Sequence, residues 1–232
     1  MGAEQHPAGE SAPPRVLVID VGGTNVKLRT SEHDEIRKHP SGPGLTPEQM
    51  VQVVRELCSD WDYDVVSIGF PGPVLAGRPA CEPHNLGEGW VGFDFEAACG
   101  KPVRLVNDAA MQALGSYQGG KMLFLGLGTG LGSAVVVDGR VESLELAHLP
   151  YKKGRTYEDY VGRRGLERLG NKKWSRNVKD VVERLRQALV MDYVVLGGGN
   201  ARKLKELPEN ARLGDNANAF PGGFRLWGVE AD

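Results

Sequence analysis

The chain has 232 residues, a formal net charge of −2 at pH 7 and a hydrophobic fraction of 41%. That length suits one large domain or two lobes, and the near-neutral charge excludes a basic field that would attract nucleic acid or anionic lipid. The three cysteines, Cys58, Cys81 and Cys99, fit neither a disulfide framework nor a zinc motif. No apolar run approaches membrane-spanning length, and the first residues lack the pattern of a signal peptide. We therefore expect a cytoplasmic protein without a membrane or nucleic-acid partner.

The order of apolar segments predicts a flexible tail followed by an α/β lobe. Residues 1–14 have no apolar period and are predicted to be disordered. Residues 15–118 are predicted to form an N-terminal lobe with strands at 15–20, 25–30, 64–70 and 103–106 and helices at 46–60 and 107–117. Tight glycine turns close the first hairpin of this lobe.

A second α/β lobe is predicted for residues 119–232. It has strands at 122–127, 133–137 and 192–196, helices across 157–188 and the start of a helix at 201. In the segment 216–224, Pro221 and two glycines disfavour a helix. Because strands precede helices twice along the chain, two α/β lobes are the simplest architecture.

Three predicted strands end in glycine-rich turns. Glycine permits left-handed dihedrals and close approach, so successive backbone amides can converge on a phosphate oxygen. An ordinary hairpin turn or strand-to-helix connection is the alternative for each. None of the three has the ending of a Walker A loop or the dinucleotide fingerprint, which excludes P-loop and Rossmann sites. The predicted phosphate-binding residues are Gly22, Gly23, Thr24, Gly128, Thr129, Gly130, Gly198 and Gly199.

Two carboxylates stand where predicted strands end. Asp20 precedes the first glycine turn, where it can hold Mg²⁺, usually through water, against a transferring phosphate, or can simply cap the turn. Lys27 could neutralise phosphate, although a solvated lysine is equally plausible on the second strand of this hairpin. Asp108 follows Asn107 at the start of a predicted helix, which is a suitable position for a general base, with helix capping as the alternative for either residue.

Further polar residues suit the recognition of several neighbouring hydroxyl groups. Glu145, His148 and Glu158 supply two carboxylates and an imidazole, and Asn85 lies in a loop rich in proline and glycine. Structural roles remain the alternative for each of them. The cluster at residues 152–155 (KKGR) could guide a polyanionic donor, or could be a solvated turn.

Together these motifs resemble the ROK family of bacterial sugar kinases, especially its glucokinase and polyphosphate-glucokinase branch. The resemblance covers about residues 15–200 and rests on ordered segments: residues 20–24 (DVGGT), 69–73 (GFPGP), 107–109 (NDA), 128–132 (GTGLG), 145–148 (ELAH), Glu158 and 197–199 (GGG). It implies two ribonuclease-H-like lobes of the actin/hexokinase type around a central cleft, with Asp108 as the base and Asn107, Glu145, His148 and Glu158 as sugar ligands. It also implies Mg²⁺, ATP or polyphosphate as the phosphoryl donor, and often a homodimer.

Some features depart from the family pattern. The segment 149–157 contains no cysteine, so no structural zinc is expected, and Ala147 replaces a glycine, which is tolerated unless the backbone needs a positive φ.

We expect a hexose kinase that phosphorylates the 6-hydroxyl of glucose. A sugar-binding regulator is the alternative, although the segment before the first strand has too few residues to form a helix-turn-helix. An actin-like nucleotide switch is a third possibility, but it would not need the glutamates and histidine.

Overall fold

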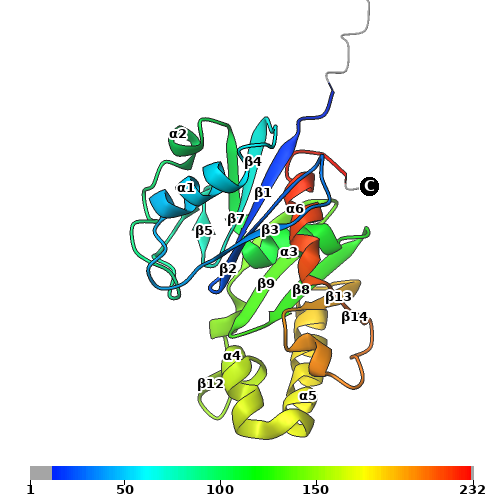
Figure 1. The fold of residues 1–232 in the computed structure, drawn as a ribbon. Helices are drawn as coiled ribbons and strands as arrows, with labels where there is room; N and C mark the ends of the chain where they lie inside the picture. The colour runs from blue at the N-terminus through cyan, green and yellow to red at the C-terminus, as the bar shows by residue number, and fades with distance from the viewer. Residues whose placement is uncertain (1–11, 231–232) are drawn as a thin grey trace, which may run out of the picture.

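The computed structural model describes residues 12–230, so the predicted tail at residues 1–14 lies mostly outside the described residues. Two five-stranded sheets dominate the fold (Figure 1). The first has the order β3-β2-β1-β4-β7, formed by β1 (Val16–Val21), β2 (Asn25–Thr30), β3 (Arg37–Pro40), β4 (Val65–Phe70) and β7 (Val103–Asn107). The second has the order β10-β9-β8-β13-β14, formed by β8 (Lys121–Leu127), β9 (Leu131–Val137), β10 (Arg140–Leu144), β13 (Tyr193–Gly197) and β14 (Ala211–Leu213).

The two sheets share one topology. In each, the first three strands form an antiparallel meander. The fourth strand then pairs parallel to the first, and the fifth pairs parallel to the fourth. This repetition agrees with the predicted pair of α/β lobes, although the boundary at residue 118 stays a prediction.

Six α-helices and two small ribbons complete the described part of the chain. The helices are α1 (Pro47–Leu57), α2 (Phe95–Cys99), α3 (Asp108–Ser116), α4 (Tyr157–Val161), α5 (Arg163–Ala188) and α6 (Ala219–Arg225). The ribbons pair β5 (Val74–Leu75) with β6 (Arg78–Pro79), and β11 (Pro150–Lys152) with β12 (Arg155–Thr156). Single 3₁₀ turns lie at Leu146–His148, Ala201–Lys203 and Asn216–Asn218. Within residues 12–230, none of the helices has the length and apolar character needed to cross a bilayer.

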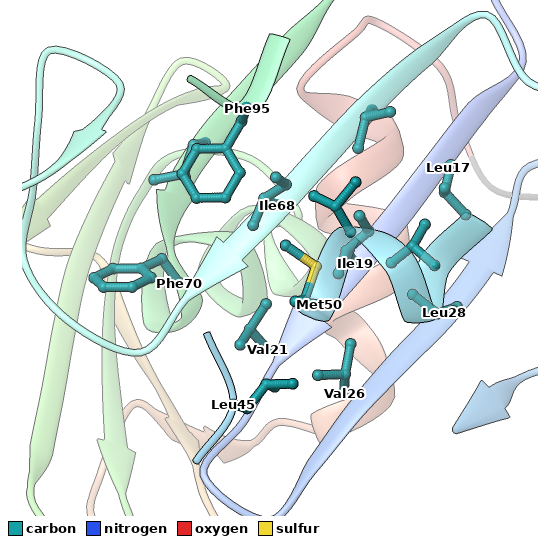
Figure 2. Packing of buried hydrophobic residues seen from close by; sticks show 14 of the residues in the cluster. Leu17, Ile19, Val21, Val26, Leu28, Leu45, Met50, Ile68, Phe70 and Phe95 are labelled. Atoms are coloured by element: carbon teal, nitrogen blue, oxygen red, sulfur yellow. The ribbon is translucent and has the colours of Figure 1, made fainter. Parts of the chain in front are cut away.

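The central strand of the first sheet is buried on both faces, which explains why its sequence is continuously apolar up to Asp20. Leu17, Ile19 and Val21 point toward α1 and pack with Met50 (Figure 2). The alternate residues of the same strand pack against the opposite cluster, which contains the aromatic side chains of α6. Helices therefore cover both faces of this sheet.

The second sheet is covered in the same way. One face packs on α5, where Trp174 and Val178 are buried. The other face packs on α3, through Phe124 and Ala113. Helix α3 also contacts β4 of the first sheet, so it connects the two sheets. Its close approach requires glycines: a Cβ on Gly132 would lie 2.9 Å from the Cβ of Ala109.

The C-terminal segment corrects one prediction. Residues 216–224, where Pro221 and two glycines disfavour a helix, form a 3₁₀ turn followed by α6. Pro221 is the third residue of α6, where a missing N–H removes no intrahelical hydrogen bond. The glycines allow tight packing, since a Cβ on Gly222 would overlap the carbonyl of Met111 in α3, and one on Gly223 would lie 2.5 Å from Val18 in β1.

Two other predicted helices differ from the structure. The helix expected from residue 201 is only the 3₁₀ turn Ala201–Lys203. The region 157–188 is helical as predicted, but it is divided into α4 and α5, and α5 is interrupted at Gly170, which has φ 69°. The interruption changes the direction of the chain without ending the hydrogen-bonded element.

Candidate active site

The first glycine turn connects β1 to β2. The amide of Gly22 donates to the carbonyl of Asn25 at 3.0 Å. Ser41 holds the turn from outside, because its amide donates to Thr24 O at 2.9 Å and its hydroxyl donates to Gly22 O at 2.5 Å. Gly23 and Thr24 are exposed, which leaves the tip of the turn accessible to a ligand. No sequence motif marks Ser41 as a residue that holds this turn.

The second and third glycine turns lie side by side. They end β8 and β13, which pair in parallel with Gly126 opposite Gly197. Gly198 has φ 80°, and a Cβ there would lie 2.6 Å from the backbone of Leu127, so only glycine fits. Asn200 fixes the arrangement by donating from its side chain to Gly128 O at 2.9 Å. The structure thus brings the predicted residues Gly128, Thr129, Gly130, Gly198 and Gly199 to one edge of the second sheet.

Asp20 lies at the end of β1 and is only 7% exposed. Its Oδ2 accepts a hydrogen bond from Lys27 Nζ at 2.9 Å, across the antiparallel register that places the two residues opposite each other. The sequence leaves Lys27 open between a phosphate ligand and a solvated residue, but a hairpin centred on the glycine turn places it opposite Asp20. Among the described residues, no cluster of three or more histidine, cysteine or acidic side chains could form a protein-only metal cage. A single strand-end carboxylate fits Mg²⁺, which usually keeps several waters and binds substrate phosphates as well.

Asn107 and Asp108 divide the two functions that the sequence leaves open between them. Asn107 is the cap of α3: its Oδ1 accepts from the amides of Ala109 and Ala110, and its Nδ2 donates to Gly72 O at 3.0 Å. Asp108 is the first residue of the helix, and its Oδ1 accepts from Ala109 N at 2.7 Å. Asn107 is therefore the helix cap, and Asp108, which shares the amide of Ala109 with it, remains the candidate for the general base.

The electrostatic environment of Asp108 suits proton transfer near neutral pH. The residue is half-buried. Burial, followed by the negative charges of Asp20 and Glu145, raises the pKa of Asp108 to about 7. Its hydrogen bond from Ala109 opposes this shift without cancelling it. Asp20 and Glu145, two other predicted site residues, are therefore both close enough to act on Asp108.

Glu158 lies against the second glycine turn. It is half-buried in α4, and its Oε2 accepts from Leu131 N at 3.2 Å. A Cβ on Gly130 would overlap the same oxygen, so the glycine makes room for the carboxylate. A capping box between Thr156 and Asp159 fixes the start of α4 and therefore the position of Glu158.

Glu145 precedes the 3₁₀ turn before β11, and His148 is the last residue of that turn. Their side chains are 55% and 75% exposed, with His148 Nε2 4.0 Å from Glu145 Oε2. Ala147 between them is buried and is not among the described non-glycine residues with positive φ, so the methyl group is accommodated as expected. Asn85 is exposed and lies against the first glycine turn, since a Cβ on Gly23 would be 3.1 Å from its Cβ.

The sequence relationships agree with these motifs. A family profile described as the ROK family matches residues 16–143, which is more than half of the chain. The chain belongs to the ROK family. Polyphosphate glucokinase of Mycobacterium leprae is 25% identical over 221 residues, which is 84% of this chain and 67% of that protein. N-acetylmannosamine kinase of Salmonella typhimurium is 31% identical over 144 residues, which is 54% of this chain and 48% of the relative.

Solved structures of ROK proteins share the fold. Inorganic polyphosphate/ATP-glucomannokinase from Arthrobacter sp. strain KM superimposes with a TM-score of 0.75 at 24% identity, covering 91% of this chain and 97% of that one. A ROK family glucokinase from Streptomyces griseus in complex with glucose and AMPPNP gives a TM-score of 0.67 at 16% identity, covering 92% and 99%. These likenesses confirm the predicted α/β fold of two ribonuclease-H-like lobes of the actin/hexokinase type.

Proposed function

We propose that this ROK protein is a sugar kinase that transfers a phosphoryl group from ATP or polyphosphate to a hexose, with the 6-hydroxyl of glucose as the acceptor. The observation that carries the proposal is the position of Asp108 together with its raised pKa. It stands at the start of the helix that joins the two sheets, and its pKa is raised to about 7. A carboxylate with this pKa can accept a proton from a sugar hydroxyl at neutral pH.

In the proposed mechanism, Asp108 orients the attacking hydroxyl and accepts its proton as the new bond to phosphorus develops. Glu145, His148 and Glu158, together with Asn85, bind the other hydroxyls of the sugar. Asn107 contributes through its position beside Asp108, since its side chain already makes the hydrogen bonds of the helix cap.

The donor phosphates bind at the glycine turns in this proposal. The paired second and third turns hold the phosphates next to Glu158, and the first turn, with Gly22, Gly23 and Thr24, holds the transferring group. Lys27 offsets the charge of Asp20 and of an incoming phosphate. Magnesium, held by Asp20 through water, would neutralise charge on the phosphates.

The first test is a matrix of ATP, GTP and polyphosphate against hexoses and N-acetylhexosamines, with sugar phosphate as the measured product. Asp108→Asn should lower kcat by about two to four orders of magnitude while the Kd for sugar, measured by calorimetry, changes little. In the wild type, kcat/KM should rise with pH to a plateau above an apparent pKa near 7. Unchanged turnover in the variant would remove Asp108 from the mechanism, and no product with any pair would refute the kinase proposal.

A further inference from the structure

The first part of α5 concentrates positive charge that the proposed chemistry does not use. Residues 163–179 contain seven basic residues and one acidic residue, Glu167, in a chain of net charge −2. In the part of the chain that the structure describes, Lys179 pairs with Glu206, and the other six form no salt bridge. These six exposed residues, here named the α5 basic track, are Arg163, Arg164, Arg168, Lys172, Lys173 and Arg176.

The track is an organised surface on the outer side of α5. Lys172 and Arg176 are four residues apart on one side of the helix and are exposed to solvent. Trp174 and Val178, on the other side, are buried against the second sheet. Arg168 is held in place, since it donates to Asp159 O at 2.7 Å and stacks on the ring of Tyr160. Like charges at the spacing of Lys172 and Arg176 destabilise a helix, so this pair of charges does not itself stabilise the fold.

Hydrogen bonds on either side of the interruption at Gly170 attach α5 to the second glycine turn and to the 3₁₀ turn that follows the third. At the start, the amide of Arg163 donates to Thr129 O at 3.2 Å. Beyond the interruption at Gly170, the side chain of Asn171 donates to Lys203 O at 3.1 Å, in the turn that follows the third glycine motif. The track therefore begins where the donor phosphates are proposed to bind and continues along α5, whose backbone is drawn in Figure 1.

We propose that the α5 basic track binds the distal phosphates of an inorganic polyphosphate donor whose phosphates next to the transferring group lie at the paired glycine turns. The inference rests on the proposed kinase function and specifies its donor. A linear polyphosphate carries negative charge on every unit and extends past the turns, so neutralising it releases counterions all along the chain. ATP ends in a nucleoside after three phosphates and does not need such a surface.

The chemistry of the track favours polyphosphate over single-stranded nucleic acid. Surfaces that bind single strands combine basic groups with aromatic rings on which the bases stack. The only aromatic residue in the segment 163–179 is Trp174, and its side chain is fully buried. The exposed groups of the segment are therefore mostly basic side chains and include no aromatic ring, which suits a polyanion that has no bases to stack.

The test compares two triple variants of the full chain. Lys172→Gln/Lys173→Gln/Arg176→Gln removes the outer part of the track. Lys101→Gln/Lys121→Gln/Arg140→Gln removes the same charge from exposed positions away from the glycine turns. We expect the track variant to raise the KM for long-chain polyphosphate about tenfold and to leave the KM for ATP within about twofold, because three exposed charge contacts are lost. Its KM should also stop improving with polyphosphate chain length, and the control variant should behave as the wild type.

Several outcomes would overturn the inference. These are an equal KM for polyphosphate in the wild type and track variant, an equal loss with ATP, an equal loss in the control variant, or RNA binding as tight as polyphosphate binding. Direct titration of the wild type with polyphosphate separates this inference from the proposed function. A protein that phosphorylates hexoses with ATP but does not bind polyphosphate refutes the track alone, whereas one that binds polyphosphate through the track but phosphorylates no hexose refutes the kinase proposal alone.

Discussion

Replacing Asp108 with asparagine should make the protein more stable while removing its activity. Because the pKa of Asp108 is raised from 3.8 to about 7, the folded protein binds this proton more tightly than the unfolded chain does. The favourable contribution of the protonated group is fully present below pH 4 and is lost as the pH rises through about 7. At about 1.4 kcal/mol per pKa unit, the ionised carboxylate costs at most about 4 kcal/mol at pH 8.

The asparagine side chain stays neutral and can still accept the hydrogen bond from Ala109. We therefore expect Asp108→Asn to raise the free energy of unfolding by about 2–4 kcal/mol at pH 8, with almost no difference at pH 4. Urea unfolding followed by tryptophan fluorescence between these pH values measures the effect. Asp62→Asn, at a side chain that is 89% exposed and paired with Arg15 at the surface, is the matched control and should change the free energy of unfolding by less than about 1 kcal/mol. A stability difference that does not vary with pH would show that the environment of Asp108 does not disfavour its charge.

Two further predictions concern the sugar site and the C-terminal helix. Glu145→Gln or His148→Ala should raise the KM for sugar about tenfold and leave the KM for the donor within about twofold, because a hydrogen bond to the sugar is lost. Steady-state kinetics measure both constants, and the opposite pattern would move these residues out of the sugar site. Gly222→Ala should lower the free energy of unfolding by about 2–4 kcal/mol, because the added methyl group overlaps the carbonyl of Met111. A Cβ on Gly44 meets nothing within 4 Å, so the control Gly44→Ala should change the free energy of unfolding by less than about 0.5 kcal/mol. Equal stability of the two glycine variants in urea would contradict the packing of α6 on α3.

The strands and helices that position the site could be predicted because their local sequence patterns match the burial and capping that the fold gives them. The continuous apolar run of β1 is what a strand buried on both faces requires, and it ends at Asp20. The Asn107-Asp108 pair follows a strand and opens a helix, and the structure contains the cap that this order indicates. In such places the local pattern and the tertiary structure favour the same conformation.

The C-terminal helix could not be predicted, because the reason for its sequence lies elsewhere in the chain. Glycine lowers helix propensity at Gly222 and Gly223, but both positions face partners that are distant in sequence, Met111 and Val18. The loss of propensity is outweighed by close packing on α3 and β1, which local patterns do not reveal. The same holds for Ser41 and Asn200, whose roles in holding the glycine turns depend on contacts across the fold.

These long-range contacts also connect the two halves of the candidate site. Helix α3 carries Asp108 at its first turn, packs on the second sheet along one side and meets α6 through Gly115 and Gly222 on another. Helix α6 in turn packs on β1, the strand that carries Asp20. The position of Asp108, the proposed general base, relative to the first glycine turn therefore depends on three packed elements and not on one loop. A change that loosens α6 should disturb the separation of Asp20 and Asp108, and with it the raised pKa on which the proposed proton transfer depends.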